Sequence, residues 1–198
     1  RQPDLTVVME NVNKPHNLAA IIRTCDAVGI PKVHAVATHP EIRTKQNSAS
    51  GSNKWVELDI HKSTEEAFAT LRQRGFQIFV AHFSAQSTDF RTIDFTQPTA
   101  LVVGAELNGI SETAISLADG SLYIPMVGMV ESLNVSVATA IMLFEAERQR
   151  TERGFYDSRR FDEATYKRLL IEFAYPRVAG TYKKKNKPYP EMNAEGDI

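Results

Sequence analysis

Three polar or glycine-bearing segments of the sequence each follow directly after an apolar stretch. They are residues 10–17, with Arg23 further along, residues 104–109, which include Glu106, and residues 125–134, which include Ser132 and Asn134. Ligands of open parallel sheets bind beyond the carboxyl ends of the strands. We therefore expect the three segments to converge at one sheet edge, where an arginine, a carboxylate, a serine and asparagines would line one site.

Taken one at a time, the same residues also fit purely structural roles. Asn17 and Asn134 are of a type that caps helices. Arg23 and Glu106 could form a structural ion pair, and the glycines of 104–109 are common in turns. The residue types alone leave both interpretations open.

Familiar catalytic signatures are absent from the sequence. It contains no Gly-x-Gly-x-x-Gly stretch after a strand, no Gly-Lys-Ser/Thr phosphate loop, no His-Glu-x-x-His helix and no Gly-x-Ser-x-Gly elbow. This argues against dehydrogenases, common nucleotidases, zinc proteases and hydrolases. The five histidines are never three or four positions apart, so no metal site is predicted. Cys25 lies on the apolar side of a predicted helix and is interpreted as a buried hydrophobe.

The composition indicates one compact domain with a modest appendage, since 42% of the 198 residues are hydrophobic and 24% are charged. We place the domain in residues 1–150 and the appendage in residues 151–198. A single cysteine favours a reducing compartment, and because no secretory signal opens the sequence, we expect the cytoplasm. The longest apolar runs fall short of the roughly 20 residues that a membrane span needs, so no membrane association is expected.

Positive charge is concentrated near the end of the chain, although the net charge is only −1. Residues 167–190 carry seven cations against one anion, Glu172. Tyr175, Tyr182 and Tyr189 are interleaved with these cations, and aromatic rings beside cations suit unstacked bases. A nucleic-acid contact and a solvated basic tail are the two interpretations of this stretch.

Apolar strands alternate with helical patterns along most of the chain. The predicted strands are residues 5–9, 32–37, 56–60, 77–81, 99–103 and 121–124. The predicted helices are residues 17–28, the stretch between the Ser63 capping box and Gly75, and residues 111–117, 135–150 and 162–173. The polar stretch 38–53 is long enough to indicate a functional loop. This alternation predicts an α/β fold in which a mostly parallel sheet has helices on both faces.

The predicted helix that begins after Asn134 is apolar almost all round over residues 135–144. A helix of this kind has to be buried on more than one side. Burial inside the domain and burial against a second copy both satisfy this requirement, and in a chain this short we favour a homodimer.

Together, the three polar segments resemble the motifs of the SpoU class of the SPOUT RNA methyltransferase superfamily, and within it the tRNA guanosine-18 2′-O-ribose methyltransferases. The resemblance rests on Asn-Leu-Ala-Ala-Ile-Ile-Arg-Thr at 17–24, Leu-Val-Val-Gly-Ala-Glu-Leu-Asn-Gly-Ile at 101–110 and Ile-Pro-Met-Val-Gly-Met-Val-Glu-Ser-Leu-Asn-Val-Ser-Val-Ala at 124–138. The order and spacing fit over residues 5–150, and the Lys-Pro-Tyr-Pro stretch at 187–190 is similar to the tail of the tRNA enzymes. Ala19 stands where the family often has glycine, and the N-terminal helical extension of relatives is not represented.

The resemblance implies an α/β knot fold, with a C-terminal trefoil knot against the rule that chains are unknotted, followed by a helical basic tail. It also implies an enzyme that uses S-adenosylmethionine to methylate the ribose 2′-hydroxyl of guanosine 18 in tRNA. No metal is implied. The implied donor site consists of Ala81, Gly104, Ile124, Met126, Leu133 and Ala138.

Five residues are implied as the catalytic set. Arg23 would be the base, or would clamp the substrate phosphate and stabilise the developing alkoxide. Asn17 would orient the ribose or Arg23, Glu106 would hold Arg23 through a charge-assisted bond, and Ser132 with Asn134 would shape the loop between donor and acceptor.

Cations that would contact RNA phosphates complete the expected site. They are Lys14, His16, Arg43, Lys45, Arg148, Arg150, Lys183, Lys184 and Lys185. Three alternatives stay open: the same chemistry on ribosomal RNA, a catalytically silent RNA-binding module on the same fold, and an unrelated α/β nucleotide-binding domain.

Overall fold

The structure is a computed structural model that describes residues 1–37, 55–193 and 195–198. The chain divides into a unit of residues 1–159 and a C-terminal unit of residues 160–198, and each is described by itself. Arg43 and Lys45, two of the predicted RNA contacts, lie outside the described residues.

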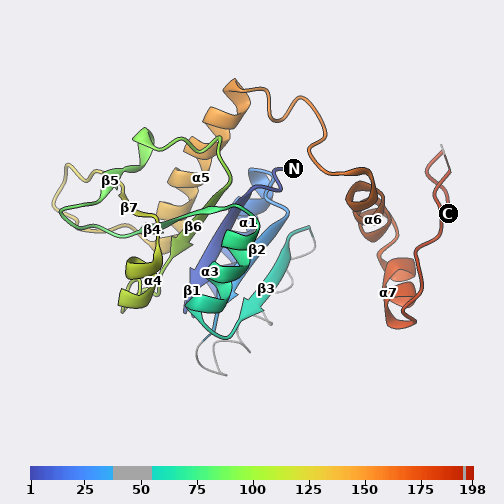
Figure 1. The fold of residues 1–198 in the computed structure, drawn as a ribbon, viewed down its shortest axis with the longest axis horizontal. Coiled ribbons are helices and arrows are strands. Elements are labelled where there is room, and N and C mark those ends of the chain that lie inside the picture. Colours follow the sequence, from blue (N-terminus) through green and yellow to red (C-terminus); the bar gives the residue numbers. More distant parts are fainter. Residues whose placement is uncertain (38–54, 194) are drawn as a thin grey trace. The chain divides into compact units, whose positions relative to one another are not determined.

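A seven-stranded parallel sheet forms the centre of the first unit (Figure 1). Its strands lie in the order β3-β2-β1-β6-β4-β7-β5, and every neighbouring pair is parallel. Their bounds are β1 (Leu5–Glu10), β2 (Lys32–Val36), β3 (Glu57–His61), β4 (Gln77–Ala81), β5 (Thr88–Asp89), β6 (Thr99–Val103) and β7 (Gly120–Tyr123). All residues of the central strands β1 and β6 are buried, as expected for parallel strands covered on both faces.

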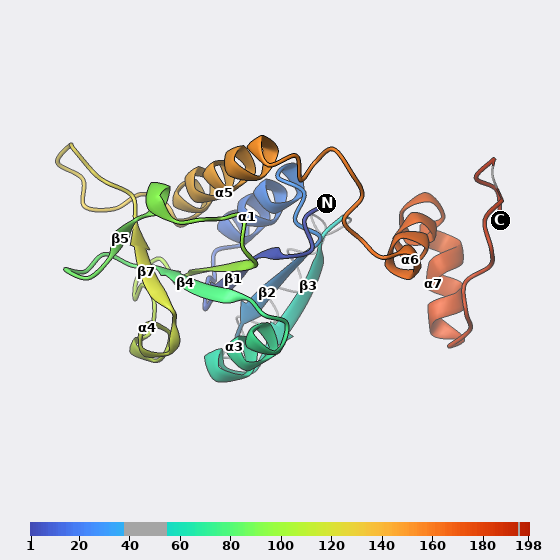
Figure 2. The same ribbon diagram turned by 45° about the horizontal axis from the view of Figure 1, so that its top comes forward.

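Helices cover both faces of this sheet (Figure 2). On one face lie α1 (Pro15–Ala27) and α5 (Val135–Glu152), which add Ile22 and Leu143 to the larger core cluster. On the other lie α3 (Thr64–Gln73) and α4 (Glu112–Leu117), with Phe68 and Ala114 in the second cluster. A short 3-10 helix, η2 (Phe90–Thr92), follows β5. The predicted α/β fold with helices on both faces of a parallel sheet is confirmed, and the trefoil knot remains a prediction.

Local sequence signals explain where the helices begin and end. The Ser63 side chain accepts a hydrogen bond in the first turn of α3, and Gly75, with a φ of +79°, follows its last turn. Helix α1 begins at Pro15, because proline suits the first helical position. Its N-cap is therefore Lys14, and the interpretation of Asn17 as a helix cap is wrong.

The C-terminal unit consists of α6 (Glu163–Ala174), α7 (Pro176–Lys184) and the chain end. The Tyr189 hydroxyl donates to Glu172 at 2.9 Å, and the Tyr175 hydroxyl donates to the Gly196 carbonyl at 2.8 Å. These bonds hold the last residues against the two helices. The sequence patterns predict α6 but give no separate bounds for α7.

Candidate active site

Asn17, in the first turn of α1, joins all three polar segments. Its Nδ2 donates to Glu106 Oε1 at 2.5 Å, and its Oδ1 accepts from Asn134 Nδ2 at 3.2 Å. The partners are 89 and 117 positions away along the chain. Asn17 is only 1% exposed, whereas Glu106 is partly exposed and Asn134 is exposed, so the network is shielded from water on the Asn17 side only. The structure thus brings together three of the five residues predicted as catalytic.

Asn134 has a structural role as well. Its Oδ1 caps α5 by accepting from the Ser136 N–H at 2.9 Å and from the Ser136 hydroxyl at 2.6 Å. The capping interpretation is therefore right for Asn134. Because the cap uses only the oxygen, the amide Nδ2 is left to bind Asn17.

Arg23 is exposed on α1 and makes no ion pair or hydrogen bond within the described part of the chain. It lies about 9 Å further along the helix axis than Asn17, given the rise of about 1.5 Å per residue. The expectation that Glu106 holds Arg23 is therefore wrong, because the Asn17 amide is nearer and binds Glu106 instead. Ser132 is also exposed, and no described residue forms a hydrogen bond with it.

The segment that carries Glu106 is a tight loop whose two ends bond to each other. The Ala105 N–H donates to the Gly109 carbonyl at 3.0 Å, and the Gly109 N–H donates to the Ala105 carbonyl at 2.8 Å. A Cβ atom added to Gly104 would lie 2.2 Å from the Gly109 carbonyl oxygen. Gly104 is therefore required for the close approach of two backbone segments.

The residues expected to bind the methyl donor cluster in part at neighbouring strand ends. Ala81 ends β4, Gly104 follows β6 and Ile124 follows β7, and these three strands are adjacent in the sheet. Met126 and Leu133 lie in the segment after β7, and Ala138 lies in the first turns of α5. All six are partly exposed, so their surfaces are accessible to a ligand.

The segment after β7 has unpaired main-chain groups. Over residues 125–133, no hydrogen bond joins a main-chain N–H or C=O to another group of the described residues. A ligand held largely through main-chain groups requires such free donors and acceptors. The residues present therefore fit a bound S-adenosylmethionine.

The cations of the first unit that were predicted to contact phosphates differ in their exposure and in their ion pairs. Lys14 and His16 are exposed at the start of α1. Arg148 is exposed but paired with Glu145 at 2.8 Å and Glu152 at 2.5 Å. These contacts are local to α5, so Arg148 carries no free positive charge.

Arg150 is a correction, because it is 0% exposed and cannot reach an RNA phosphate. Its guanidinium donates to Asp4 Oδ1 at 2.6 Å and to the main-chain carbonyls of Phe95 and Gln97 at 2.8 and 3.1 Å. It thereby joins the end of α5 to the start of β1 and to the segment before β6. Its role is structural.

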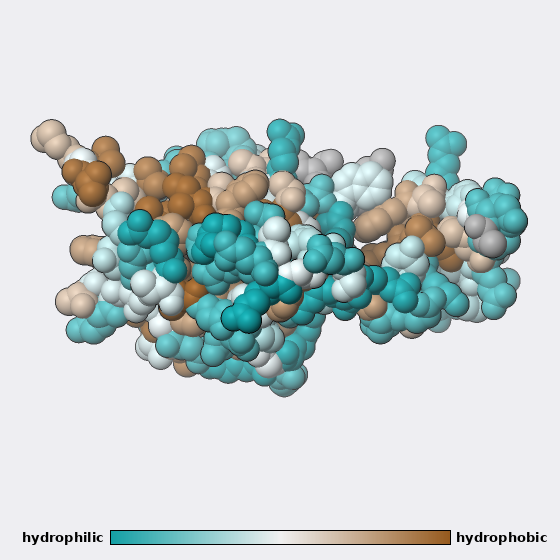
Figure 3. Space-filling model, turned by 90° about the horizontal axis from the view of Figure 1, so that it is seen from above, coloured by the Kyte–Doolittle hydropathy of each residue, from teal (hydrophilic) through white to brown (hydrophobic). Residues whose placement is uncertain are grey.

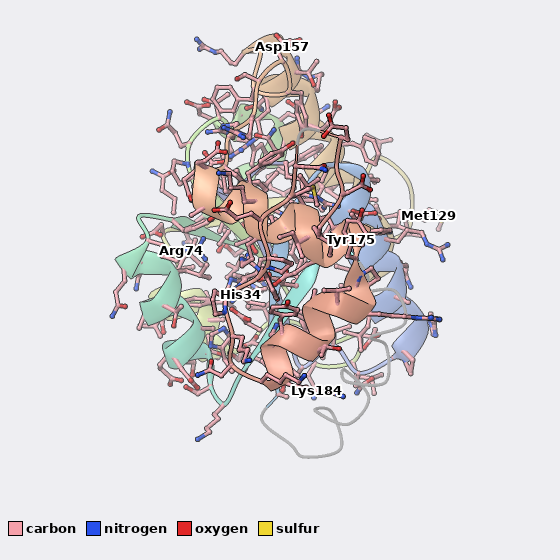
Figure 4. All side chains as sticks on the ribbon, turned by 90° about the vertical axis from the view of Figure 1, so that its right-hand side faces the viewer. His34, Arg74, Met129, Asp157, Tyr175 and Lys184 are labelled. Carbon is pink, nitrogen blue, oxygen red and sulfur yellow. The ribbon has the colours of Figure 1, made fainter. Side chains whose placement is uncertain are left out.

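In the C-terminal unit, Lys183, Lys184 and Lys185 are exposed at the end of α7, where Figure 4 labels Lys184. The tyrosines among the cations are only partly exposed. The hydroxyls of Tyr175 and Tyr189 bond within the unit. The lysines are thus free to meet a polyanion, whereas these two tyrosines stabilise the unit itself.

An apolar surface extends over α5 and the segment after β7 (Figure 3). Its members share an exposure of more than a third; they are Val127, Met129, Val130, Val137, Ile141 and Phe144. Met129 is 102% exposed and lies at the periphery in Figure 4. The opposite side of α5 is buried against the core, so within one chain the helix is covered on one side only.

Cys25 is 0% exposed, and burial raises the pKa of its thiol, so the expected role as a small buried hydrophobe is confirmed. Among the described residues, no three His, Cys, Asp or Glu side chains are grouped as metal ligands would be. In the same part of the chain, no helix combines the length and the hydropathy needed to cross a membrane.

Known proteins are similar to this chain over almost its whole length. Residues 4–144 match the model of the SpoU rRNA Methylase family, and residues 148–198 match that of the SpoU rRNA methylase C-terminal region. A tRNA (guanosine(18)-2′-O)-methyltransferase of Escherichia coli (strain K12) is 50% identical over 200 residues, which cover 100% of this chain and 87% of that protein.

Solved structures are similar as well. The crystal structure of the A. aeolicus TrmH/SpoU tRNA modifying enzyme superposes with a TM-score of 0.80 at 41% identity, covering 90% of this chain and 91% of that one. The SpoU methyltransferase AviRb from Streptomyces viridochromogenes, in complex with the cofactor AdoMet, gives a TM-score of 0.66 at 28% identity, covering 74% of this chain and 60% of that one.

Proposed function

The chain belongs to the SpoU rRNA methylase family, and we propose that it methylates the ribose 2′-hydroxyl of guanosine 18 in tRNA. It is an S-adenosylmethionine-dependent RNA 2′-O-ribose methyltransferase. The observation that carries this conclusion is the network of Asn17, Glu106 and Asn134, which draws the three motifs of the family into one site. The tRNA substrate follows from the relatives that share about half of the sequence.

Methyl transfer requires the 2′-oxygen in line with the methyl carbon, and the hydroxyl proton has to leave. When bound, S-adenosylmethionine supplies a methyl group activated by its sulfonium. Positioning contributes much of the rate of such reactions. Hydrogen bonds from Asn17 to Glu106 and from Asn134 to Asn17 fix the orientations of these side chains. Together they form the surface that orients the ribose. Ser132, in the same segment as Asn134, shapes the loop between donor and acceptor.

Arg23 is the residue that binds and stabilises negative charge in this mechanism. Its exposed guanidinium lacks a counter-ion within the described residues, so it is available to an RNA phosphate, which it can bind through two parallel bonds. There it also stabilises the negative charge that develops on the 2′-oxygen. Because a guanidinium keeps its proton in proteins, the hydroxyl proton passes to a phosphate oxygen or to water.

Main-chain groups of residues 125–133 hold the methyl donor in this proposal. Ala81, Gly104 and Ile124 supply the surface at the strand ends, and Met126, Leu133 and Ala138 the apolar lining. Such a site needs no glycine-rich dinucleotide fingerprint.

RNA binding and assembly complete the proposal. Lys14, His16 and Lys183–Lys185 contact phosphates, which position the RNA without reading its sequence. The exposed apolar surface on α5 pairs with its counterpart in a homodimer, since large exposed apolar patches mark interfaces. A tRNA substrate and the free thiol of Cys25 both suit the cytoplasm.

The test is transfer of labelled methyl from S-adenosylmethionine to three RNAs. They are an unmodified tRNA transcript, the same transcript with adenosine at position 18, and a ribosomal RNA fragment. We expect label only in the first, in a sugar that resists alkaline cleavage. Label only in ribosomal RNA would keep the chemistry and refute the substrate.

Variants of the protein test the site. Arg23→Ala should bind the donor normally and transfer no methyl. Arg74→Ala removes another exposed arginine, at the C-cap of α3, and should be fully active. Appreciable transfer by Arg23→Ala would refute its assignment.

A further inference from the structure

Glu10, the last residue of β1, is a buried carboxylate that the chemistry above does not use. It is 2% exposed, and it has no ion pair within the described residues. Burying a charge is costly unless hydrogen bonds compensate for the lost water. Its surroundings therefore have to supply strong donors.

Three donors converge on this carboxylate. The Ser111 N–H donates to Oε2 at 2.8 Å, the Ser111 hydroxyl donates to Oε1 at 2.7 Å, and the Thr64 hydroxyl donates to Oε1 at 2.5 Å. Ser111 is also the N-cap of α4, because its Oγ accepts from the Ala114 N–H. Glu10 thus connects β1 with the starts of α3 and α4.

The position of Glu10 in the chain relates it to the site. It directly precedes the segment that leads to Asn17, and Ser111 directly follows the loop that carries Glu106. Hydrogen bonds therefore join the two segments at two places. Ser111 bonds to Glu10 where the segments leave the sheet, and Asn17 bonds to Glu106 within the site.

We propose that Glu10 is a positioning residue for methyl transfer, which sets the loop of residues 104–110 against the segment of residues 11–17 so that Glu106 meets Asn17. This inference rests on the proposed function. Weakening the contact between Glu10 and Ser111 should shift the loop. A displacement of about 1 Å at a reacting centre can reduce turnover about a hundredfold. Glu10 bonds to none of the residues assigned to the donor or to RNA, so binding of tRNA should be preserved. Gly104 belongs to the shifted loop, so donor affinity should fall together with kcat.

Three variants of the full chain separate positioning from stability. Glu10→Gln and Ser111→Ala weaken the contact between Glu10 and Ser111. Thr64→Val instead removes the donor that α3 contributes to the same carboxylate. We expect Glu10→Gln and Ser111→Ala each to lower kcat, measured at saturating donor, at least about tenfold, with KM for tRNA within about twofold of the wild type. The double variant should be no worse than the poorer single one, since both act through one contact. Thr64→Val should keep its kcat.

Hydrogen exchange gives a readout without turnover. The Gly109 N–H, bonded inside the loop, should exchange faster in Glu10→Gln and Ser111→Ala but not in Thr64→Val. If the wild type methylates no RNA, the proposed function fails, and this measurement still decides whether Glu10 sets the position of the loop. If Glu10→Gln does not fold, Ser111→Ala against Thr64→Val decides it. Wild-type kcat in Glu10→Gln and Ser111→Ala, or an equal loss in Thr64→Val at matched Tm, would overturn it.

Discussion

Changing Asn17 to Asp tests the network at its centre with a single atom. The substitution keeps the shape of the side chain but replaces the Nδ2 donor, 2.5 Å from Glu106 Oε1, with an oxygen. A second carboxylate would then contact Glu106 in a place where the wild-type residue is 1% exposed. The bond from Asn134 to the other oxygen is retained. The perturbation is therefore confined to the contact between residues 17 and 106.

The expected size of the effect follows from that contact. A hydrogen bond to a charged group contributes about 1.5–3 kcal/mol, and repulsion between the two carboxylates adds to its loss. At about 1.4 kcal/mol per factor of ten, loss of the hydrogen bond alone should lower kcat/KM about tenfold to about 150-fold, and the repulsion should lower it further. Two carboxylates in contact favour sharing one proton, and a shared proton restores a hydrogen bond. The defect of Asn17→Asp relative to the wild type should therefore shrink as the pH falls from about 8 to about 6.

The assay is methyl transfer to the tRNA transcript at several pH values for Asn17→Asp, Glu106→Gln and the double variant. Glu106→Gln keeps an acceptor for the Asn17 amide, so its loss should be the smallest. In the double variant the new glutamine amide can donate to the new carboxylate, and activity should recover at least about fivefold over Asn17→Asp. The reasoning is refuted if Asn17→Asp is as active as the wild type. It is equally refuted if Glu106→Gln is near normal while the double variant stays as poor as Asn17→Asp.

The remaining predictions concern the loop, a buried histidine and the basic end of the chain. Gly104→Ala places a Cβ 2.2 Å from a carbonyl oxygen and should abolish donor binding in calorimetry, whereas Gly180→Ala, which meets nothing within 4 Å, should not; normal binding by the first variant would contradict the predicted role of the loop. His34 (Figure 4) bonds His61 at 2.9 Å, and burial followed by the charge of His61 lowers its pKa from 6.5 to about 4. Between these pH values the folded state thus binds fewer protons than the unfolded chain, so the free energy of unfolding should fall by about 3 kcal/mol as the pH drops from about 6.5 to about 4. In thermal unfolding, the stability of His34→Gln should decline less over this pH range than that of the wild type. An identical decline in both proteins would exclude His34 as the cause. Replacing Lys183–Lys185 together with Ala should reduce the slope of log affinity for tRNA against log salt by about two to three, with donor binding unchanged; an unaltered slope would remove these lysines from the interface.

The meeting of Asn17, Glu106 and Asn134 could be predicted from the sequence because it depends on topology. Each belongs to a segment that follows an apolar strand, and in a parallel sheet all such segments emerge at one edge. Alternation of apolar stretches and helical patterns was enough to establish that arrangement. The finer contacts were not predictable in this way, because they depend on side-chain reach rather than on element order.

The error about Arg150 has a specific physical cause. Arg150 lies in the last half of α5, where residues 145–152 are polar except for Ala146, so the sequence of this part does not tell which side faces the core. Arg150 faces inward because Asp4 and the carbonyls of Phe95 and Gln97 lie there, and all of these partners are distant in the chain. A buried arginine satisfied by remote carbonyls looks, in sequence, the same as an exposed one.

The missing ion pair between Arg23 and Glu106 is informative about mechanism. Opposite charges in adjacent motifs favour a pair, yet Glu106 is bound by the neutral amide of Asn17. An ion pair would have neutralised the guanidinium before substrate arrived, whereas an amide binds the carboxylate without adding positive charge to the site. Under the proposed function, Arg23 would therefore have its full charge available for a phosphate and for the developing oxyanion, where a charge-assisted bond is strongest. In the proposed mechanism, the buried Asn17 thus acts through Glu106, by holding this carboxylate away from Arg23.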